Sequence, residues 1–98
     1  MRTIKQLLKE EKWVFFKFST NAVCYRFLID AQSEGLTFWG KTEPCSLGAM
    51  DMAVLLPGGY LSSVRQPGRI AYTQAGDRVI RIDYEKYVNG DPDCFILP

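Results

Sequence analysis

The run from Trp13 to Phe18 limits the possible folds more than any other part of the sequence. It contains one tryptophan, one valine and three phenylalanines, and its only charged residue is Lys17. A strand of this composition carries apolar side chains on both of its faces, so it fits a strand covered on both sides better than a solvent-facing edge. The sequence therefore predicts that the first strand lies at the centre of a sheet.

Length and composition indicate one folded domain over residues 1–98. The chain is 47% hydrophobic and 13% aromatic, far from the low hydrophobicity that is typical of disorder. A chain this short buries only about 60 to 65% of the surface that its unfolded form exposes, so its core must pack efficiently. Twelve Lys and Arg against 11 Asp and Glu leave a net charge of +1, which gives no strong overall attraction to nucleic acid or anionic lipid. A charged site must then be a local patch.

Two helices are predicted in the first third of the chain. Thr3 followed by Gln6 matches a capping box, and the apolar residues that follow predict a short helix ending near Lys12. Thr20 and its polar neighbours are good N-cap residues for a second helix, which ends at Gly35 because glycine readily adopts the left-handed conformation. The apolar stripe of this amphipathic helix, over residues 21–34, consists of Val23, Phe27 and Ala31, flanked by Cys24 and Leu28.

Short strand-like runs make up most of the remaining sequence. Turn residues separate several of them every eight to ten residues, which is typical of an antiparallel meander. One helical turn is expected after Asp83, and the longest loop is expected over residues 40–48. The predicted strands after the first are Leu36–Trp39, Met52–Leu56, Tyr60–Val64, Arg69–Thr73, Arg78–Asp83 and a last edge strand at Cys94–Leu97.

These elements predict an α+β fold. We expect an antiparallel-rich sheet of about five or six strands, with one main helix packed on one face and a short N-terminal helix. The helix has a single apolar stripe, so it needs a sheet to cover it. The predicted core consists of Val14, Phe16, Val23, Phe27, Leu28, Phe38, Val54, Ile80 and Ile82.

The residue types present argue against an enzyme. The chain has no histidine, which removes the usual general base near neutral pH and the commonest zinc ligand. Asp83 with Glu85, and Asp91 with Asp93, are expected to be ordinary solvated acids rather than a catalytic or calcium-binding pair. We predict no metal and no cofactor. The cysteines, which are expected to be reduced and mostly buried, are Cys24, Cys45 and Cys94.

One segment matches a phosphate-binding motif letter for letter. Gly35 to Thr42 reads G-x-x-x-x-G-K-T, but a working phosphate loop lies between a strand and a helix, so that backbone N–H groups and the helix dipole face the phosphates. Here a predicted helix comes before the motif, and Glu43 and Pro44 follow it. We therefore do not expect nucleotide hydrolysis.

Basic and aromatic residues form the most plausible ligand site. Arginines on or beside three consecutive predicted strands could converge on one sheet face or edge. Arginines on exposed strands more often pair with cross-strand acids, such as Asp77 and Asp83, or deter edge aggregation. Trp39 lies beside a flexible cationic loop and suits stacking on a base, although it could instead be a core residue. Arg78 and Tyr60 belong to the same wider set. The predicted ligand-binding residues are Trp39, Lys41, Thr42, Arg65, Arg69, Tyr72 and Arg81.

Part of the sequence resembles small uncharacterised proteins encoded by bacteriophages and prophages. The helix with Phe27 and Leu28, the Glu34-Gly35 turn, the aromatic strand at Phe38-Trp39-Gly40 and the later short strands carry this resemblance, over residues 13–87. It implies an accessory factor that antagonises host defences, either by sequestering a signalling nucleotide or by masking a host protein. No catalytic motif is transferred by it.

Two functional hypotheses follow. In the first, the protein sequesters an anionic, nucleotide-like small molecule without turning it over, and it is a homo-oligomer whose sites lie between subunits. In the second, it is a protein-interaction module that covers a host defence or regulatory protein. The N-terminal residues lack a signal-peptide pattern and no apolar run reaches the roughly 20 residues that span a bilayer, so we expect a cytoplasmic protein without membrane contact.

Overall fold

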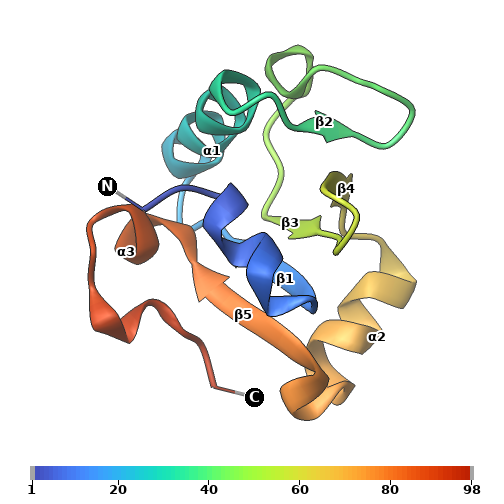
Figure 1. The fold of residues 1–98 in the computed structure, drawn as a ribbon, viewed down its shortest axis with the longest axis vertical. Helices are drawn as coiled ribbons and strands as arrows, with labels where there is room; N and C mark the ends of the chain where they lie inside the picture. The colour runs from blue at the N-terminus through green and yellow to red at the C-terminus, as the bar shows by residue number, and fades with distance from the viewer. Residues whose placement is uncertain (1, 98) are drawn as a thin grey trace.

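A five-stranded mixed sheet forms the centre of the protein (Figure 1). The computed structural model describes residues 2–97, without the side chains of residues 66 and 67. The strands are β1 (Trp13–Lys17), β2 (Thr37–Phe38), β3 (Met52–Leu55), β4 (Tyr60–Ser63) and β5 (Val79–Asp83). Their order across the sheet is β2-β4-β3-β1-β5. The predicted α+β class is confirmed.

The prediction of an antiparallel-rich sheet is wrong. β3 pairs antiparallel with β1 and with β4, but β1 pairs parallel with β5 and β2 pairs parallel with β4. The reason is that the segment predicted as a strand at Arg69–Thr73 belongs to a helix, α2 (Gln66–Gln74). A helix between β4 and β5 provides the long crossover that parallel pairing requires, whereas a meander of hairpins does not.

The helical character of α2 follows from an apolar period that extends beyond residues 69–73 to Ala75. Ala71, Tyr72 and Ala75 pack against the apolar cluster on the sheet, and their spacing of one, three and four residues is that of one helix face. Pro67 stands in the first turn, where proline is well tolerated because the first N–H groups of a helix have no partner within the helix.

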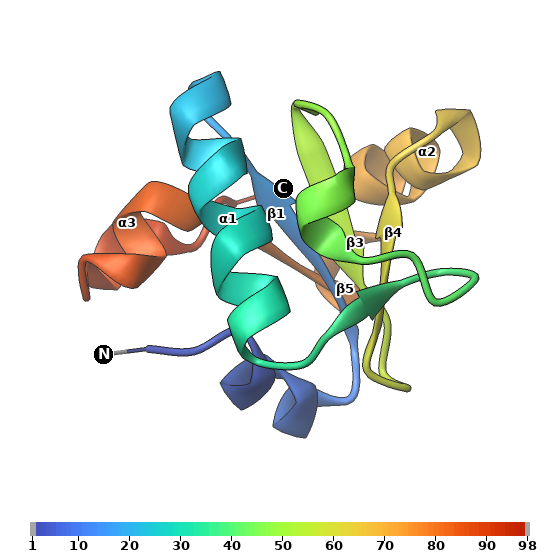
Figure 2. The ribbon, with the colours of Figure 1, turned by 90° about the horizontal axis from the view of Figure 1, so that it is seen from above.

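Helices cover both faces of the sheet (Figure 2). α1 (Asn21–Ser33) and α3 (Tyr84–Val88) pack on one face, and α2 packs on the other. The hydroxyl of Thr20 accepts a hydrogen bond from the Val23 N–H at 3.2 Å, as its predicted N-cap role requires. A single main helix on one face is therefore an incomplete description, because the fold is a three-layer sandwich around a small sheet.

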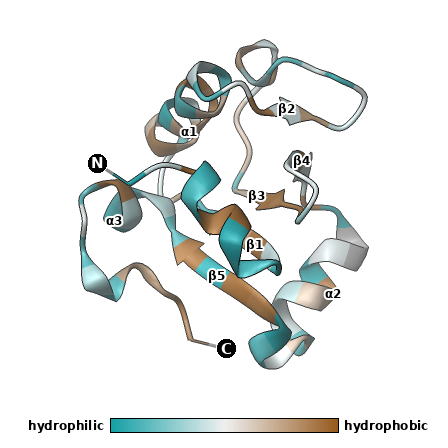
Figure 3. Cartoon of the chain, viewed as in Figure 1, coloured by the Kyte–Doolittle hydropathy of each residue, from teal (hydrophilic) through white to brown (hydrophobic). Residues whose placement is uncertain are grey.

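The predicted central position of the first strand is confirmed. Phe15 and Phe16 are both fully buried, Phe16 in the cluster beneath α1 and Phe15 in the cluster beneath α2. Figure 3 shows apolar residues along β3 and β5. Of the nine predicted core residues, eight are buried, and Ile80 is half-buried against the same cluster. Val54 differs from the others because it belongs to the α2 side.

The two ends of the chain pack beside α1 and β5. The N-terminal helix η1 (Lys5–Glu10) is a 3-10 helix, and the Gln6 side chain accepts a hydrogen bond from the Thr3 N–H at 2.9 Å. The predicted last strand is reduced to one bridge between Ile82 and Phe95. The other 3-10 helices are η2 (Pro44–Ser46), η3 (Gly76–Arg78) and η4 (Pro92–Cys94). Within residues 2–97, none of the helices has the length and apolar character needed to cross a bilayer.

Candidate functional site

A cavity of about 370 Å³ lies at the β2 edge of the sheet. This volume is within the range of small-molecule sites, roughly 300 to 1,000 Å³. Three of the seven predicted ligand-binding residues, Trp39, Thr42 and Arg65, line it together. The complete lining is Phe38, Trp39, Thr42, Leu47, Met50, Ser62, Ser63 and Arg65, and we call it the edge cavity.

A tight turn after β2 forms one wall of the edge cavity. The Phe38 N–H donates to the Thr42 carbonyl at 2.9 Å, and the Thr42 N–H donates to the Phe38 carbonyl at 3.2 Å. Gly40 and Lys41 both have positive φ angles, 80° and 62°, as a turn this tight requires. This is the segment that matches the phosphate-loop pattern. The turn differs from a phosphate loop, because Glu43 and then only the three-residue 3-10 helix η2 follow it, in place of an α-helix. Two of its N–H groups are also bonded within the turn.

Trp39 stands at the rim of the cavity. Its side chain is 71% exposed, so the alternative that it belongs to the core is wrong. Consecutive side chains of a strand point to opposite faces, and Phe38 takes the buried position. The Trp39 ring packs on the Tyr60 ring in an edge-on arrangement, with centroids 5.7 Å apart. This contact leaves most of the indole accessible for stacking.

The opposite wall is the end of β4, where its partner strand departs. The Trp39 N–H donates to the Leu61 carbonyl at 3.0 Å, and the chain then turns away at Gly40. Ser62 and Ser63 therefore extend past the end of the β2–β4 pairing, and the Ser62 hydroxyl donates to the Ser63 carbonyl at 3.2 Å. Nothing in the periodicity of the sequence marked these two serines as site residues.

The chemistry of the edge cavity suits a planar anion. Arg65 is exposed and provides a guanidinium fork, which binds phosphate or carboxylate oxygens in pairs. The hydroxyls of Thr42, Ser62 and Ser63 are additional hydrogen-bonding groups, and the Trp39 ring is a stacking surface. None of the described residues of the lining is acidic, so no carboxylate opposes the binding of an anion.

Comparison with known proteins assigns no family or activity to the chain. No family model matches it, and neither a curated protein nor a solved structure gives a significant match. The function is therefore argued from the residues of the site.

Two further predicted residues lie near the edge cavity without lining it. Lys41 is exposed on the turn beside Trp39. Arg69, on α2, pairs with Asp51, each carboxylate oxygen being 2.9 Å from the Arg69 Nη2 atom. The hydrogen bond from Arg69 lowers the pKa of Asp51 below its ordinary value. Both side chains are largely exposed, so this pair contributes little to stability. The sequence had suggested Asp77 and Asp83 as acidic partners for the arginines, and Asp51 was missed.

Tyr72 and Arg81 lie together elsewhere, between α2 and β5. Arg81 is only 4% exposed. Its Nε–H donates to the Tyr72 carbonyl at 2.6 Å and its Nη1–H donates to the Gly76 carbonyl at 2.9 Å. Carbonyls at a helix C-terminus are good partners for a cation because they carry the negative end of the helix dipole. Within residues 2–97, the buried Nη2 atom has no hydrogen-bond partner. Arg81 therefore fastens the end of α2 to the sheet.

The cysteines and the most strongly shifted tyrosine lie apart from the edge cavity in the described part of the chain. Cys24 and Cys94 are buried and Cys45 is exposed, and burial raises the pKa of the Cys24 thiol. The Tyr84 hydroxyl donates to the Asp30 carboxylate at 2.5 Å. Burial first, and this hydrogen bond second, raise the pKa of Tyr84 well above its ordinary value. In the described part of the chain, no three side chains of His, Cys, Asp or Glu are grouped closely enough to hold a metal ion.

Proposed function

We propose that this protein binds a small, planar, anionic ligand of nucleotide type in the edge cavity and releases it unchanged. The observation that carries this proposal is the convergence of Trp39, Thr42 and Arg65 on one cavity. They come from the β2 turn and from the residue before α2, which are separated by more than 20 positions in the sequence.

The lining of the edge cavity favours binding over catalysis. Of its described residues, Arg65 alone carries an ionisable side chain, and an arginine stays protonated at any physiological pH. A serine or threonine hydroxyl becomes a useful nucleophile only beside a general base. Thr42 donates to the Trp39 carbonyl at 3.4 Å and Ser62 to the Ser63 carbonyl, so neither hydroxyl is paired with a base. We therefore propose a non-enzymatic protein.

The resemblance to phage and prophage accessory proteins supplies a context for such binding. A small protein that sequesters a signalling nucleotide lowers the free concentration of that nucleotide by mass action, without any chemical step. We propose this role for the protein in the host cytoplasm. It requires tight binding and slow release, which an aromatic stacking surface combined with a charge-assisted contact favours.

Calorimetric titration with AMP, ATP and a cyclic dinucleotide tests the proposal. Trp39→Ala and Arg65→Ala should each weaken binding about tenfold or more, because charge-assisted and stacking contacts contribute about 1.5 to 3 kcal/mol. Arg69→Ala is the matched control, since Arg69 is an exposed arginine outside the cavity lining. The bound nucleotide should be recovered intact after denaturation. Equal binding by all three variants, or recovery of a hydrolysed product, would contradict the proposal.

Masking of a host protein is the second candidate function. Tyr25 and Ile29 lie one helical turn apart on α1 and are 48% and 61% exposed. An apolar pair on an outer helix face suits a protein interface, including the expected homo-oligomer. Ile29→Asp should abolish such an interface and leave nucleotide binding unchanged. Light scattering of the wild type and this variant at tens of micromolar checks self-association.

A further inference from the structure

The helix α2 covers only part of its sheet face. Val14 pairs with Leu55, which places Trp13 opposite Leu56, and the Leu56 N–H donates to the Tyr60 carbonyl at 2.8 Å. Trp13, Leu56 and Tyr60 therefore form one row across β1, β3 and β4. The neighbouring row begins at Phe15, which packs under Tyr72 of α2 with ring centroids 5.6 Å apart. Among the α2 side chains that the structure describes, no ring packs on the first row in this way, and Trp13 and Tyr60 are 43% and 46% exposed.

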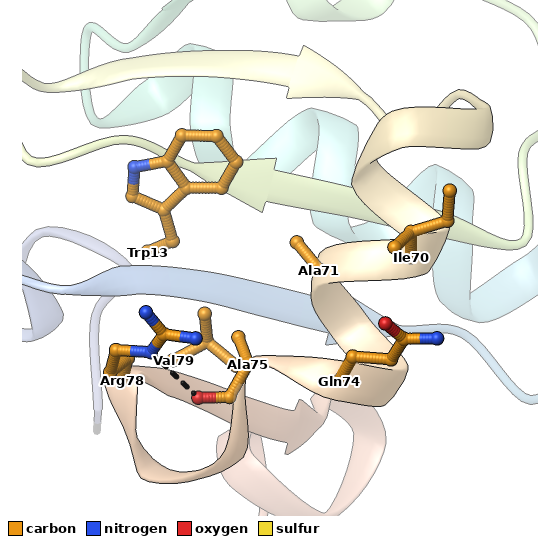
Figure 4. A pocket seen from close by; sticks show the side chains of 7 residues that line it. All are labelled: Trp13, Ile70, Ala71, Gln74, Ala75, Arg78 and Val79. Carbon is orange, nitrogen blue, oxygen red and sulfur yellow. Dashed lines mark hydrogen bonds between the residues drawn. The ribbon is translucent and has the colours of Figure 1, made fainter.

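Shared lining residues place three cavities next to one another, and we call their combined surface the groove. The edge cavity shares Ser62, Ser63 and Arg65 with a second cavity of about 300 Å³, whose other walls include Leu56 and Trp13. Trp13 in turn also lines a third cavity, of about 520 Å³, between β1, β5 and α2. Figure 4 shows the third cavity, with the Trp13 indole on one side, the α2 side chains on the other and Arg78 beside Val79.

The charges along this groove have one sign. Arg65 lines the first two cavities and Arg78 lines the third, whereas none of the three has an acidic residue in its described lining. The Arg78 Nε–H donates to the Ala75 carbonyl at 3.3 Å (Figure 4). Both arginines are exposed. A protein with a net charge of only +1 thus has a local groove that attracts anions.

Exposed rings between two cations match one class of ligand. A single strand of nucleic acid has flat bases that stack on aromatic side chains and phosphates that bind arginine. Trp39, Tyr60 and Trp13 follow one another across the sheet, from β2 to β1. Adjacent strands are about 4.8 Å apart, so the four spacings from β2 to β5 give a groove roughly 19 Å long. That length holds roughly three to six nucleotides, at a stacked rise of about 3.4 Å or more.

We infer that this groove binds a short single strand of DNA or RNA, with bases stacked on Trp13 and Trp39 and phosphates held by Arg65 and Arg78. The inference rests on the proposed nucleotide site at one end only, because Trp39 and Arg65 are shared. Trp13 and Arg78 lie outside the edge cavity. Variants of these two residues therefore separate the long groove from the small site.

Fluorescence anisotropy with labelled dT8, dA8 and U8, and with an eight-base-pair duplex, tests this inference. The wild type should bind the single strands and prefer them to the duplex, because paired bases are not available for stacking. Trp13→Ala should weaken single-strand binding at least fivefold, and Trp13→Phe should retain part of it. Arg78→Ala should also weaken binding, and should reduce the slope of log K against log salt concentration by about 0.7. Comparison of U8 with dT8 and dA8 distinguishes RNA from DNA.

Two controls keep the outcomes distinct. Trp13→Ala and Arg78→Ala should bind AMP as the wild type does, and circular dichroism should show that both are folded. Arg26→Ala changes an exposed arginine in a different cavity, beside α3, and should bind the single strands normally. Normal single-strand binding by Trp13→Ala, or equal affinity for the duplex, would overturn the inference while the AMP result decides the proposed function. A dimer that Trp13→Ala converts to a monomer would also overturn it, because the groove would then be an interface between copies.

Discussion

The two faces of the central sheet are built differently. Beneath α1, the rings of Phe16, Phe18, Phe27 and Tyr84 touch one another with centroids 5.0 to 6.3 Å apart, and each is almost completely buried. Beneath α2, Phe15 meets Tyr72, but Trp13 in the next row stays 43% exposed. The 13-residue helix α1 and the five-residue helix α3 cover the first face, whereas the nine-residue helix α2 covers the second.

This difference assigns stabilisation of the fold to one face of the sheet and leaves part of the other face available for binding. Buried aromatic area is the main source of stabilisation, and the α1 face supplies most of it. Apolar rings on the α2 face are left partly in water, where they contribute less to folding and are accessible to a ligand. A chain of this size therefore stabilises its fold through one face and is free to use the uncovered part of the other.

Replacement of an aromatic residue on each face tests this comparison most strongly. Phe27→Ala should lower the free energy of unfolding by about 3 to 5 kcal/mol, the usual cost of removing a buried phenylalanine. Trp13→Ala should lower it by less, about 1 to 2 kcal/mol, because 43% of this residue already contacts water. Urea denaturation of both variants measures the difference. Similar losses for the two would show that the faces are equally important for folding.

Replacement of Arg81 should have the next largest effect on stability, and this effect should be confined to the α2 face. Arg81→Ala removes two charge-assisted hydrogen bonds, one to the Tyr72 carbonyl in the last turn of α2 and one to the Gly76 carbonyl just beyond it, so we expect a loss of about 2 kcal/mol. Hydrogen exchange should accelerate in α2 before it does in α1. Arg81→Met, which keeps the apolar length of the side chain without the buried charge, is the matched variant and should lose less. Uniform acceleration over both helices would contradict the local role.

Tyr84 links the stability of the α1 face to alkaline pH. Its raised pKa means that the folded protein holds the phenolic proton more tightly than the unfolded chain does. This contribution to stability is complete below the ordinary tyrosine pKa of about 10, and it is lost as the pH rises above that value. Tyr84→Phe should cost about 1 to 2 kcal/mol at neutral pH, through the lost bond to Asp30, and should show a shallower decline above pH 10. Tyr25→Phe, at an exposed tyrosine, is the control and should follow the wild type at every pH.

The ion pair between Arg69 and Asp51 gives the smallest expected effect. Arg69→Ala should return the pKa of Asp51 towards its ordinary value, because the hydrogen bond that lowers it is removed. The ion pair makes a small stabilising contribution at neutral pH. This contribution is lost as the pH falls through the lowered pKa of Asp51. Carbon NMR titration of the aspartate carboxyls measures the shift. An unchanged Asp51 titration would show that the pair is not formed in solution.

Local patterns in the sequence determined much of the fold. The apolar stripe at Val23, Phe27 and Ala31 identified α1, and the uninterrupted apolar run at β1 indicated a strand covered on both faces. These predictions succeeded because periodicity and burial are properties of a few neighbouring residues. The same locality explains the error at Arg69–Thr73, where a short window did not include the residues that complete the apolar face of α2.

The composition of the sites depended on contacts between distant segments. The sequence marked Trp39, Thr42 and Arg65 as binding residues by type, but only the pairing of β2 with β4 places the first two beside Arg65. It also grouped Arg81 with them, although the turn from α2 into β5 directs that side chain into the protein. Residue chemistry is encoded at each position, whereas the direction of a side chain depends on strand register and on the path of the connecting helix. The sequence alone therefore determined which groups could bind an anion, and the tertiary structure decided which of them face the same cavity.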